Sequence, residues 1–284
     1  MFTSPYVTPW RSSLKLLGGL LMLLVAQAAS GEGLQYQVLY RGVFSIGSQI
    51  AIADVTLRSR HPGTQADYRE SELVASSQAY DYVETFYPIR YRFRSWFAED
   101  LSTGLAFEYY RQKRRSNIKH RLIYLDNPKQ PFVTRDLVAE GELDLPALLD
   151  GSYRRVSSNA QEARFDRLAL LQHVRAQDLS PGREFSVRVS NGKRMMDYRV
   201  SVEARELVQA AGRNWQALKV RFDGVRINEL GHEEHAHRPI FIWFSDDPKH
   251  IPLRAVSRHT LGKFTIKLRK IVESPSQLAR LQVG

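Results

Sequence analysis

The 284-residue sequence contains no cysteine, only four methionines, and no long apolar run beyond its first 26 residues. The missing cysteines exclude a disulfide scaffold, a zinc site built on thiolates, a cysteine nucleophile and lipid attachment to an N-terminal cysteine. Acidic residues are also few, with 30 Asp and Glu against 41 Lys and Arg and a net charge of +11. The 43% of hydrophobic residues is enough for a folded core, so a disordered or collagen-like chain is excluded.

The N-terminus has the pattern of a secretory signal. Two basic residues lie within the first 15, an uncharged apolar run follows over 16–26, and Ala26 and Ala28 have the spacing that a signal peptidase requires. The run is shorter than the roughly 20 residues of a transmembrane helix. We therefore predict a cleaved signal peptide over residues 1–28, or alternatively to Ser30, and a periplasmic protein, with an uncleaved N-terminal anchor as the alternative.

Export to the periplasm changes which anionic molecules are expected to bind this basic protein. Without the signal peptide the chain keeps 39 basic and 30 acidic residues, a net charge of +9. Nucleic acid is not expected in the periplasm, so the expected anionic partners are envelope lipid, lipopolysaccharide or a cell-wall polymer. Peripheral membrane contact fits the same charge, and no segment after the signal is apolar enough to span a bilayer.

Alternation of apolar and polar residues from residue 34 onwards predicts an all-β fold. We expect one domain over residues 33–272, built as an antiparallel, strongly curved sheet or β-barrel-like structure, and a C-terminal tail over 273–284. Asn191 and Gly192 form the strongest hairpin signal, since both tolerate positive φ. The strands are expected at residues 34–40, 48–58, 68–76, 80–87, 89–97, 105–113, 119–125, 184–190, 193–204, 215–227, 238–245, 253–259 and 264–270.

One stretch in the middle of the chain has helical periodicity instead. Apolar residues recur at helical spacing from Phe165 to Val174. We expect a main helix at about 160–177, with Ser157 or Ser158 as its N-cap. Pro181 and Gly182 then end the segment.

Several sequence blocks carry a family resemblance. Gly-Val-Phe-Ser-Ile-Gly at 42–47 follows a Tyr-rich opening, Arg-Phe-Asp-Arg-Leu-Ala-Leu-Leu-Gln-His-Val-Arg spans 164–175, and Ile-Trp-Phe-Ser-Asp-Asp at 242–247 is followed by Ile-Pro-Leu-Arg. In these blocks, from about 34 to 270, the sequence resembles a bacterial exported family called domain of unknown function 3108 (DUF3108). The resemblance implies an envelope-facing, β-rich domain and carries over no catalytic residue.

The basic charge is concentrated between residues 90 and 121, which contain nine basic and three acidic residues. In the strand expected at 89–97, arginines alternate with Tyr91 and Phe93, which would place guanidinium groups and rings on opposite faces. Pairing with the next strand is expected to gather the charge on one surface, where Arg suits phosphate or carboxylate groups. The candidate ligand-binding residues are Arg90, Arg92, Arg94, Arg111 and Lys113, with a solvated basic face as the alternative interpretation.

A histidine-rich segment is a weaker candidate for metal binding. His232, His235 and His237 flank two glutamates, and imidazole with carboxylate would suit zinc, copper or nickel. Their spacing does not match a helical His-Glu-x-x-His site. We therefore predict an exposed polar turn and no cofactor.

Two pairs of residues, each containing aspartate, are further candidates for catalysis. Adjacent Asp246 and Asp247 lack the separation that a pair of glycosidase carboxyls requires, so a strand-ending turn is favoured. Asp166 and His173 lie seven residues apart on the expected helix, where capping and surface pairing explain them.

The favoured function is a non-enzymatic periplasmic binding or envelope-maintenance module for an amphiphilic or anionic envelope component. A hydrolase acting on envelope lipid or glycan and a protein-docking scaffold are the alternatives. A pocket bordered by Arg90, Arg92 and Arg111 would favour the first, convergent His and Asp residues the second, and a flat apolar patch the third.

Overall fold

A computed structural model of the chain describes residues 31–45, 47–61, 68–112, 118–125, 133–136, 164–190, 195–227, 233–235 and 238–273. The predicted signal peptide, the Asn191-Gly192 turn and nearly all of the predicted C-terminal tail lie outside these residues. No helix among the described residues is long and apolar enough to cross a membrane.

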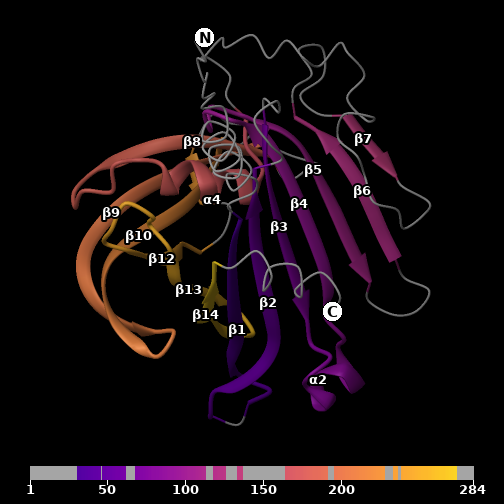
Figure 1. Ribbon diagram of the computed structural model, residues 1–284. Helices are drawn as coiled ribbons and strands as arrows, with labels where there is room; N and C mark the ends of the chain where they lie inside the picture. The colour runs from indigo at the N-terminus through magenta and orange to yellow at the C-terminus, as the bar shows by residue number, and fades with distance from the viewer. Residues whose placement is uncertain are drawn as a thin grey trace, which may run out of the picture.

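The described chain folds into a single antiparallel sheet of 14 strands with two helices (Figure 1). In spatial order the sheet runs β7-β6-β5-β4-β3-β2-β1-β14-β13-β12-β10-β9-β8, and β11 pairs with β10. The elements are β1 (Glu32–Gly42), β2 (Ile50–Arg60), β3 (Tyr68–Ser76), α2 (Asp81–Phe86), β4 (Arg90–Ala98), β5 (Gly104–Gln112), β6 (Ile118–Tyr124), β7 (Val133–Asp136), α4 (Arg167–Arg175), β8 (Glu184–Ser190), β9 (Met195–Ala210), β10 (Arg213–Ile227), β11 (Glu233–His235), β12 (Ile240–Ser245), β13 (Pro252–His259) and β14 (Gly262–Val272).

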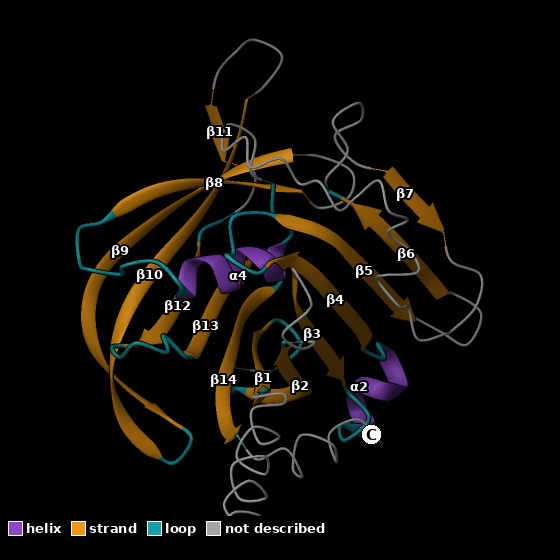
Figure 2. Ribbon diagram, turned by 45° about the horizontal axis from the view of Figure 1, so that its top comes forward, coloured by secondary structure: helices purple, strands orange, loops and turns teal. Residues whose placement is uncertain are grey.

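The sheet is strongly curved but is not closed by strand-to-strand pairing, and α4 lies inside its curve (Figure 2). The segment before α4 connects the two sides of the opening. Phe165 pairs with Val189 on β8, and the carbonyl of Arg164 accepts a 2.7 Å hydrogen bond from the amide of Gly104 at the start of β5. Two backbone groups of edge strand β8 are thereby paired, since the amide of Phe165 donates to the Arg188 carbonyl and the amide of Ser190 donates to the Phe165 carbonyl. Strands β6 and β7 continue the sheet beyond β5 at its other end (Figure 1).

Helix α4 begins at Arg167 because Asp166 caps it. The Asp166 Oδ1 atom accepts hydrogen bonds from the amides of Leu168 (2.7 Å) and Ala169 (3.1 Å). The predicted start at about 160 was therefore wrong, since Phe165 is already committed to β8. The predicted caps Ser157 and Ser158 lie outside the described residues.

Two buried apolar clusters meet at α4. Ala169, Leu170 and Val174 pack with side chains of β8, β9, β10 and β12, whereas Leu168 packs with side chains of β1, β2, β13 and β14. The helix therefore fills the interior that the curved sheet alone would leave open, and both clusters lose apolar contacts if it is displaced.

The predicted all-β fold class is confirmed, with local differences. The run expected as a strand at 80–87 forms α2, where the Tyr80 carbonyl accepts from the amides of Val83 and Glu84 as the chain turns from β3 to β4. None of its six residues is buried, so its apolar pattern reflects no core contact. Strands β7 and β11 were not predicted; both are short.

Candidate functional site

The predicted basic strand forms as β4, but its arginines are held by internal carboxylates. Arg90 makes two 2.6 Å contacts with the carboxylate of Glu84 on α2. These charge-assisted bonds hold the pKa of Glu84 below its usual range. The Arg90 guanidinium is thereby directed to α2.

Arg92 and Arg94 belong to a row of alternating charges that crosses four strands. Strand register places Arg58, Glu72, Arg94 and Glu108 directly opposite one another on β2, β3, β4 and β5. The Arg94 Nε atom lies 3.5 Å from Glu72 and 3.9 Å from Glu108, and Arg92 donates a 3.1 Å bond to Glu108. Glu108 is fully buried, so this row is part of the protein's internal packing.

Strand register also corrects the prediction that the hairpin gathers its charge on one surface. Arg111 lies opposite Tyr91, and Arg92 lies opposite Tyr110. Because opposite residues share a face, Arg111 is on the face away from Arg92, and its guanidinium stacks 5.7 Å from the Tyr91 ring centroid. Lys113 lies outside the described residues.

Of the three histidines considered for metal binding, only His235 is described. It lies on β11 with its ring exposed, and its Nδ1 atom is 3.0 Å from Asp223. No cluster of three or more potential ligands occurs within the described parts of the chain. His232 and His237 fall outside them.

The acidic residues considered for catalysis have structural roles. Asp247 Oδ1 accepts bonds from the Ser245 hydroxyl (3.0 Å) and the Lys249 amide (2.9 Å), which confirms the predicted turn. Asp246 pairs with Arg205 at 2.8 Å. These contacts organise the loop between β12 and β13.

Asp166 and His173 do not form a catalytic array with the nearby serine. Ser95 donates a 2.6 Å bond directly to Asp166, while the Nδ1–H of His173 donates to the Leu101 carbonyl at 2.8 Å. Burial raises the pKa of Asp166 to about 6, against the opposing effect of the Ser95 and amide hydrogen bonds.

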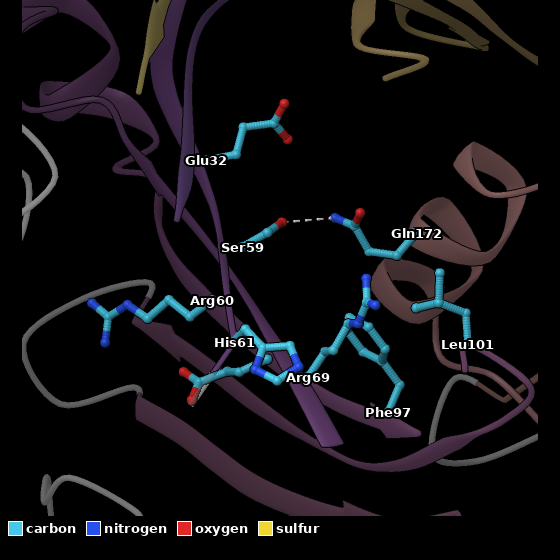
Figure 3. Close-up of a pocket in the computed structure, with 9 residues that line it drawn as sticks. Glu32, Ser59, Arg60, His61, Arg69, Phe97, Leu101 and Gln172 are labelled. Carbon is cyan, nitrogen blue, oxygen red and sulfur yellow. Dashed lines mark hydrogen bonds between the residues drawn. The ribbon is translucent and has the colours of Figure 1, made fainter. Parts of the chain in front are cut away.

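A pocket of about 280 Å³ lies between α4 and the ends of the strands on its side of the sheet (Figure 3). Its apolar part is formed by Phe97 and Leu101, and its polar wall by Gln172, which donates a 3.0 Å bond to the Ser59 hydroxyl. The lining residues are Glu32, Ser59, Arg60, His61, Arg69, Glu70, Phe97, Leu101 and Gln172. The predicted pocket residues Arg90, Arg92 and Arg111 do not line it.

Most ionisable groups of this pocket are engaged with other residues. Glu32 pairs with Arg175 at 2.7 Å, His61 Nε2 lies 3.0 Å from Glu99, and Glu70 is within 3.8 Å of Arg94. Burial raises the pKa of Glu70, with the charge of Arg94 opposing the shift. The charged side chains of Glu32, His61 and Glu70 are therefore held in place at the edge of the pocket by ion pairs.

Arg69 differs from these groups. It lies opposite Phe97 in the register of β3 and β4, so the two side chains share a face, and its guanidinium points into the space below Gln172 (Figure 3). Among the described residues no carboxylate lies within ion-pair distance of Arg69. Arg60 points away from this space. Within the described part of the chain, the pocket therefore combines an arginine that has no carboxylate partner with an apolar floor.

Comparisons with known proteins bear on the family and the fold. The sequence matches the family described as "Protein of unknown function (DUF3108)" over residues 35–269. The chain belongs to the DUF3108 family. No curated protein matches the DUF3108 chain.

The solved structures similar to the DUF3108 domain include the following two. A β-barrel-like protein of domain of unknown function DUF1849 from Brucella abortus is 10% identical with a TM-score of 0.51, covering 87% of this chain and 98% of that one. A putative lipoprotein from Parabacteroides distasonis is 9% identical with a TM-score of 0.31, covering 86% of this chain and 95% of that one. The first supports the strongly curved, barrel-like fold.

Sequence reasoning missed Arg69 in the DUF3108 domain, although alternation contained a usable signal. Along β3, Glu70 and Glu72 point to one face, while Arg69 shares the other with Ser71 and Leu73. Alternation thus places the Arg69 side chain on the face opposite Glu70 and Glu72. Searching strands for such a cation would have identified it.

Proposed function

We propose that the protein is a non-enzymatic binding module of the bacterial envelope that holds a small anionic amphiphile in the pocket beside α4. The observation that carries the proposal is the Arg69 guanidinium, which points into the pocket beside Phe97 and Leu101 and has no carboxylate partner among the described residues. A guanidinium donates paired hydrogen bonds to phosphate or carboxylate, and the apolar floor suits a short alkyl segment. The pocket volume of about 280 Å³ matches a headgroup with a short chain, at the small end of ligand sites.

Octyl phosphate is a suitable probe because it combines a phosphate with a short chain. Isothermal titration below its micelle concentration should show binding at one site, and Arg69→Gln should weaken it about ten- to a hundredfold, as expected for loss of a charge-assisted hydrogen bond. Arg269→Gln is the matched control, since Arg269 is an exposed arginine of β14 that does not line the pocket. Absence of binding, or equal losses in the two variants, would refute the proposal.

Native mass spectrometry of protein purified from its own cell envelope would identify the natural ligand. We expect a co-purifying phosphate- or carboxylate-bearing molecule in the wild type and its loss in Arg69→Gln. The same preparation tests the predicted export, because the mass of the purified chain shows whether residues 1–28 have been removed.

A further inference from the structure

The end of the sheet opposite the pocket exposes three large apolar side chains on two neighbouring loops. Val43 and Phe44 follow β1 and are 69% and 75% exposed, and Leu261 between β13 and β14 is 57% exposed. The amide of Val43 donates to the Leu261 carbonyl at 3.4 Å, which places the two loops side by side. We call these three residues with Arg41, Arg258 and Lys263 the distal rim.

The two loops of the distal rim are fixed against each other. Gly42 lies opposite Gly262, and a Cβ on Gly42 would come within 2.2 Å of the Leu261 carbonyl oxygen. The Tyr40 hydroxyl donates a 2.6 Å hydrogen bond to the same oxygen, and its ring stacks against Phe44 with centroids 6.5 Å apart. The exposed apolar side chains therefore project from a rigid base.

A row of basic residues lies directly beside these apolar side chains. Arg41 on β1 is opposite Lys263 on β14, and Lys263 is opposite Arg258 on β13. All three are exposed, and neither 41–50 nor 257–265 contains a carboxylate. Like charges on directly opposite residues destabilise a sheet, so the repulsion within this basic row lowers the stability of the isolated protein. An external negative surface would offset that cost.

We propose that the distal rim docks the protein onto a bilayer containing anionic phospholipid. Val43, Phe44 and Leu261 enter the interfacial region, and the basic row lies against lipid phosphates. The apolar side chains suit the acyl chains of such a bilayer, and the cations beside them suit its phosphates. A water-soluble polyanion has no apolar layer in which the apolar side chains could be buried. Helix α2, which contains the 84% exposed Phe86, lies at the same lower end of Figure 1.

This inference is independent of the ligand proposed for the pocket, which lies at the other end of β1, β2 and β4. Docking leaves the pocket facing away from the bilayer. Failure of octyl phosphate to bind would therefore leave membrane docking untouched, and loss of docking would leave pocket binding unchanged.

Vesicle flotation with the full domain tests the proposal. Vesicles of phosphatidylglycerol and phosphatidylethanolamine should retain the wild type, and vesicles of phosphatidylcholine alone should not. Val43→Ser with Phe44→Ser should weaken binding at least tenfold, and Arg41→Gln with Lys263→Gln about fivefold per residue. Added salt should weaken wild-type binding and have less effect on the charge variant.

Matched controls come from the same sheet. Leu207→Ser removes a 71% exposed side chain on β9, and Arg269→Gln with Lys270→Gln removes two exposed charges at the far end of β14. Both should bind vesicles like the wild type. Equal losses in controls and rim variants, or no wild-type binding to anionic vesicles, would overturn the proposal. Phe44 is too exposed for Phe44→Ser alone to unfold the domain, so that variant keeps the test valid if the double variant is unstable.

Discussion

Ser95 on β4 and Asp166 at the start of α4 are joined by a 2.6 Å hydrogen bond inside the protein. Both side chains are buried, and 71 residues separate them in the chain. The same aspartate caps α4 through two backbone amides, so one carboxyl group fixes both the end of the helix and its place against the sheet.

This carboxyl makes stability depend on pH. Because burial raises the pKa of Asp166 from 3.8 to about 6 in the folded state, the folded protein binds the proton more tightly than the unfolded chain. The stabilisation is complete below about pH 4 and is lost as the pH rises through 6, by about 2–3 kcal/mol. Urea unfolding of the wild type and Asp166→Asn from pH 4 to 7.5 tests this. The free energy of unfolding of the wild type should fall as the pH rises through 6, and that of Asp166→Asn should lack this fall. Parallel pH curves would contradict it.

Removing the carboxylate of Glu108 should strongly destabilise the fold. Glu108→Ala removes the carboxylate that Arg92 pairs with and leaves Arg94 with Glu70 and Glu72 alone, and loss of one partner of a buried ion pair costs about 3–5 kcal/mol. The matched control is Asp197→Ala on β9, whose exposed pair with Arg188 should contribute about 0–1 kcal/mol. Urea midpoints measure both, and similar losses would show that the charge row contributes no more than a surface pair.

Adding a methyl group at Gly42 should disrupt the junction between β1 and β14. The new Cβ of Gly42→Ala meets a backbone oxygen at 2.2 Å, so the strands must separate, at a cost of about 2–4 kcal/mol. Gly212→Ala has open space around it but a φ of +76°, and strain alone should cost about 1 kcal/mol. Thermal unfolding that ranks Gly212→Ala as the worse variant would contradict the packing of this junction.

Arg175 should contribute more to stability than other arginines of its surroundings. Its guanidinium pairs with Glu32 at 2.7 Å and donates to the carbonyls of Lys249 and His250, which ties α4 to β1 and to the loop before β13. Arg175→Ala should cost about 2–4 kcal/mol, since three segments lose a shared donor. Arg183→Ala removes an exposed pair with Asp178 and should have little effect on stability. Equal shifts in urea midpoint would refute this role.

Local sequence rules identified most of the sheet because strands follow alternation. The strand predicted at 68–76 forms as β3 with the same ends, and the hairpin predicted around residues 99–104 forms between β4 and β5. The turn at Asp247 was also predicted correctly, since an Asp before a proline satisfies nearby amides without help from the rest of the fold.

The candidate site was less predictable because it depends on register. Arg94 meets Glu72 and Glu108 only because β3, β4 and β5 align in one way, and a shift of one residue would place these charges on opposite faces. The start of α4 depended on Phe165 joining β8, a contact between distant segments. Composition showed that the protein is basic, but only the register showed that Arg69 shares a face with Phe97 of the pocket.

The position of β1 between β2 and β14 imposes an order on folding. Among the described strands β1 is the first in the chain and β14 the last, so β1 has β2 as a neighbour early in synthesis and β14 only late. Until that strand arrives, the row from Leu34 to Tyr40 has an open backbone edge and uncovered apolar side chains. Pairing across such a sequence distance is slow, and an open edge recruits other chains. A chain truncated before β14 is therefore expected to aggregate. During synthesis of the intact chain, the open edge of β1 must be kept from pairing with other chains until β14 has been made.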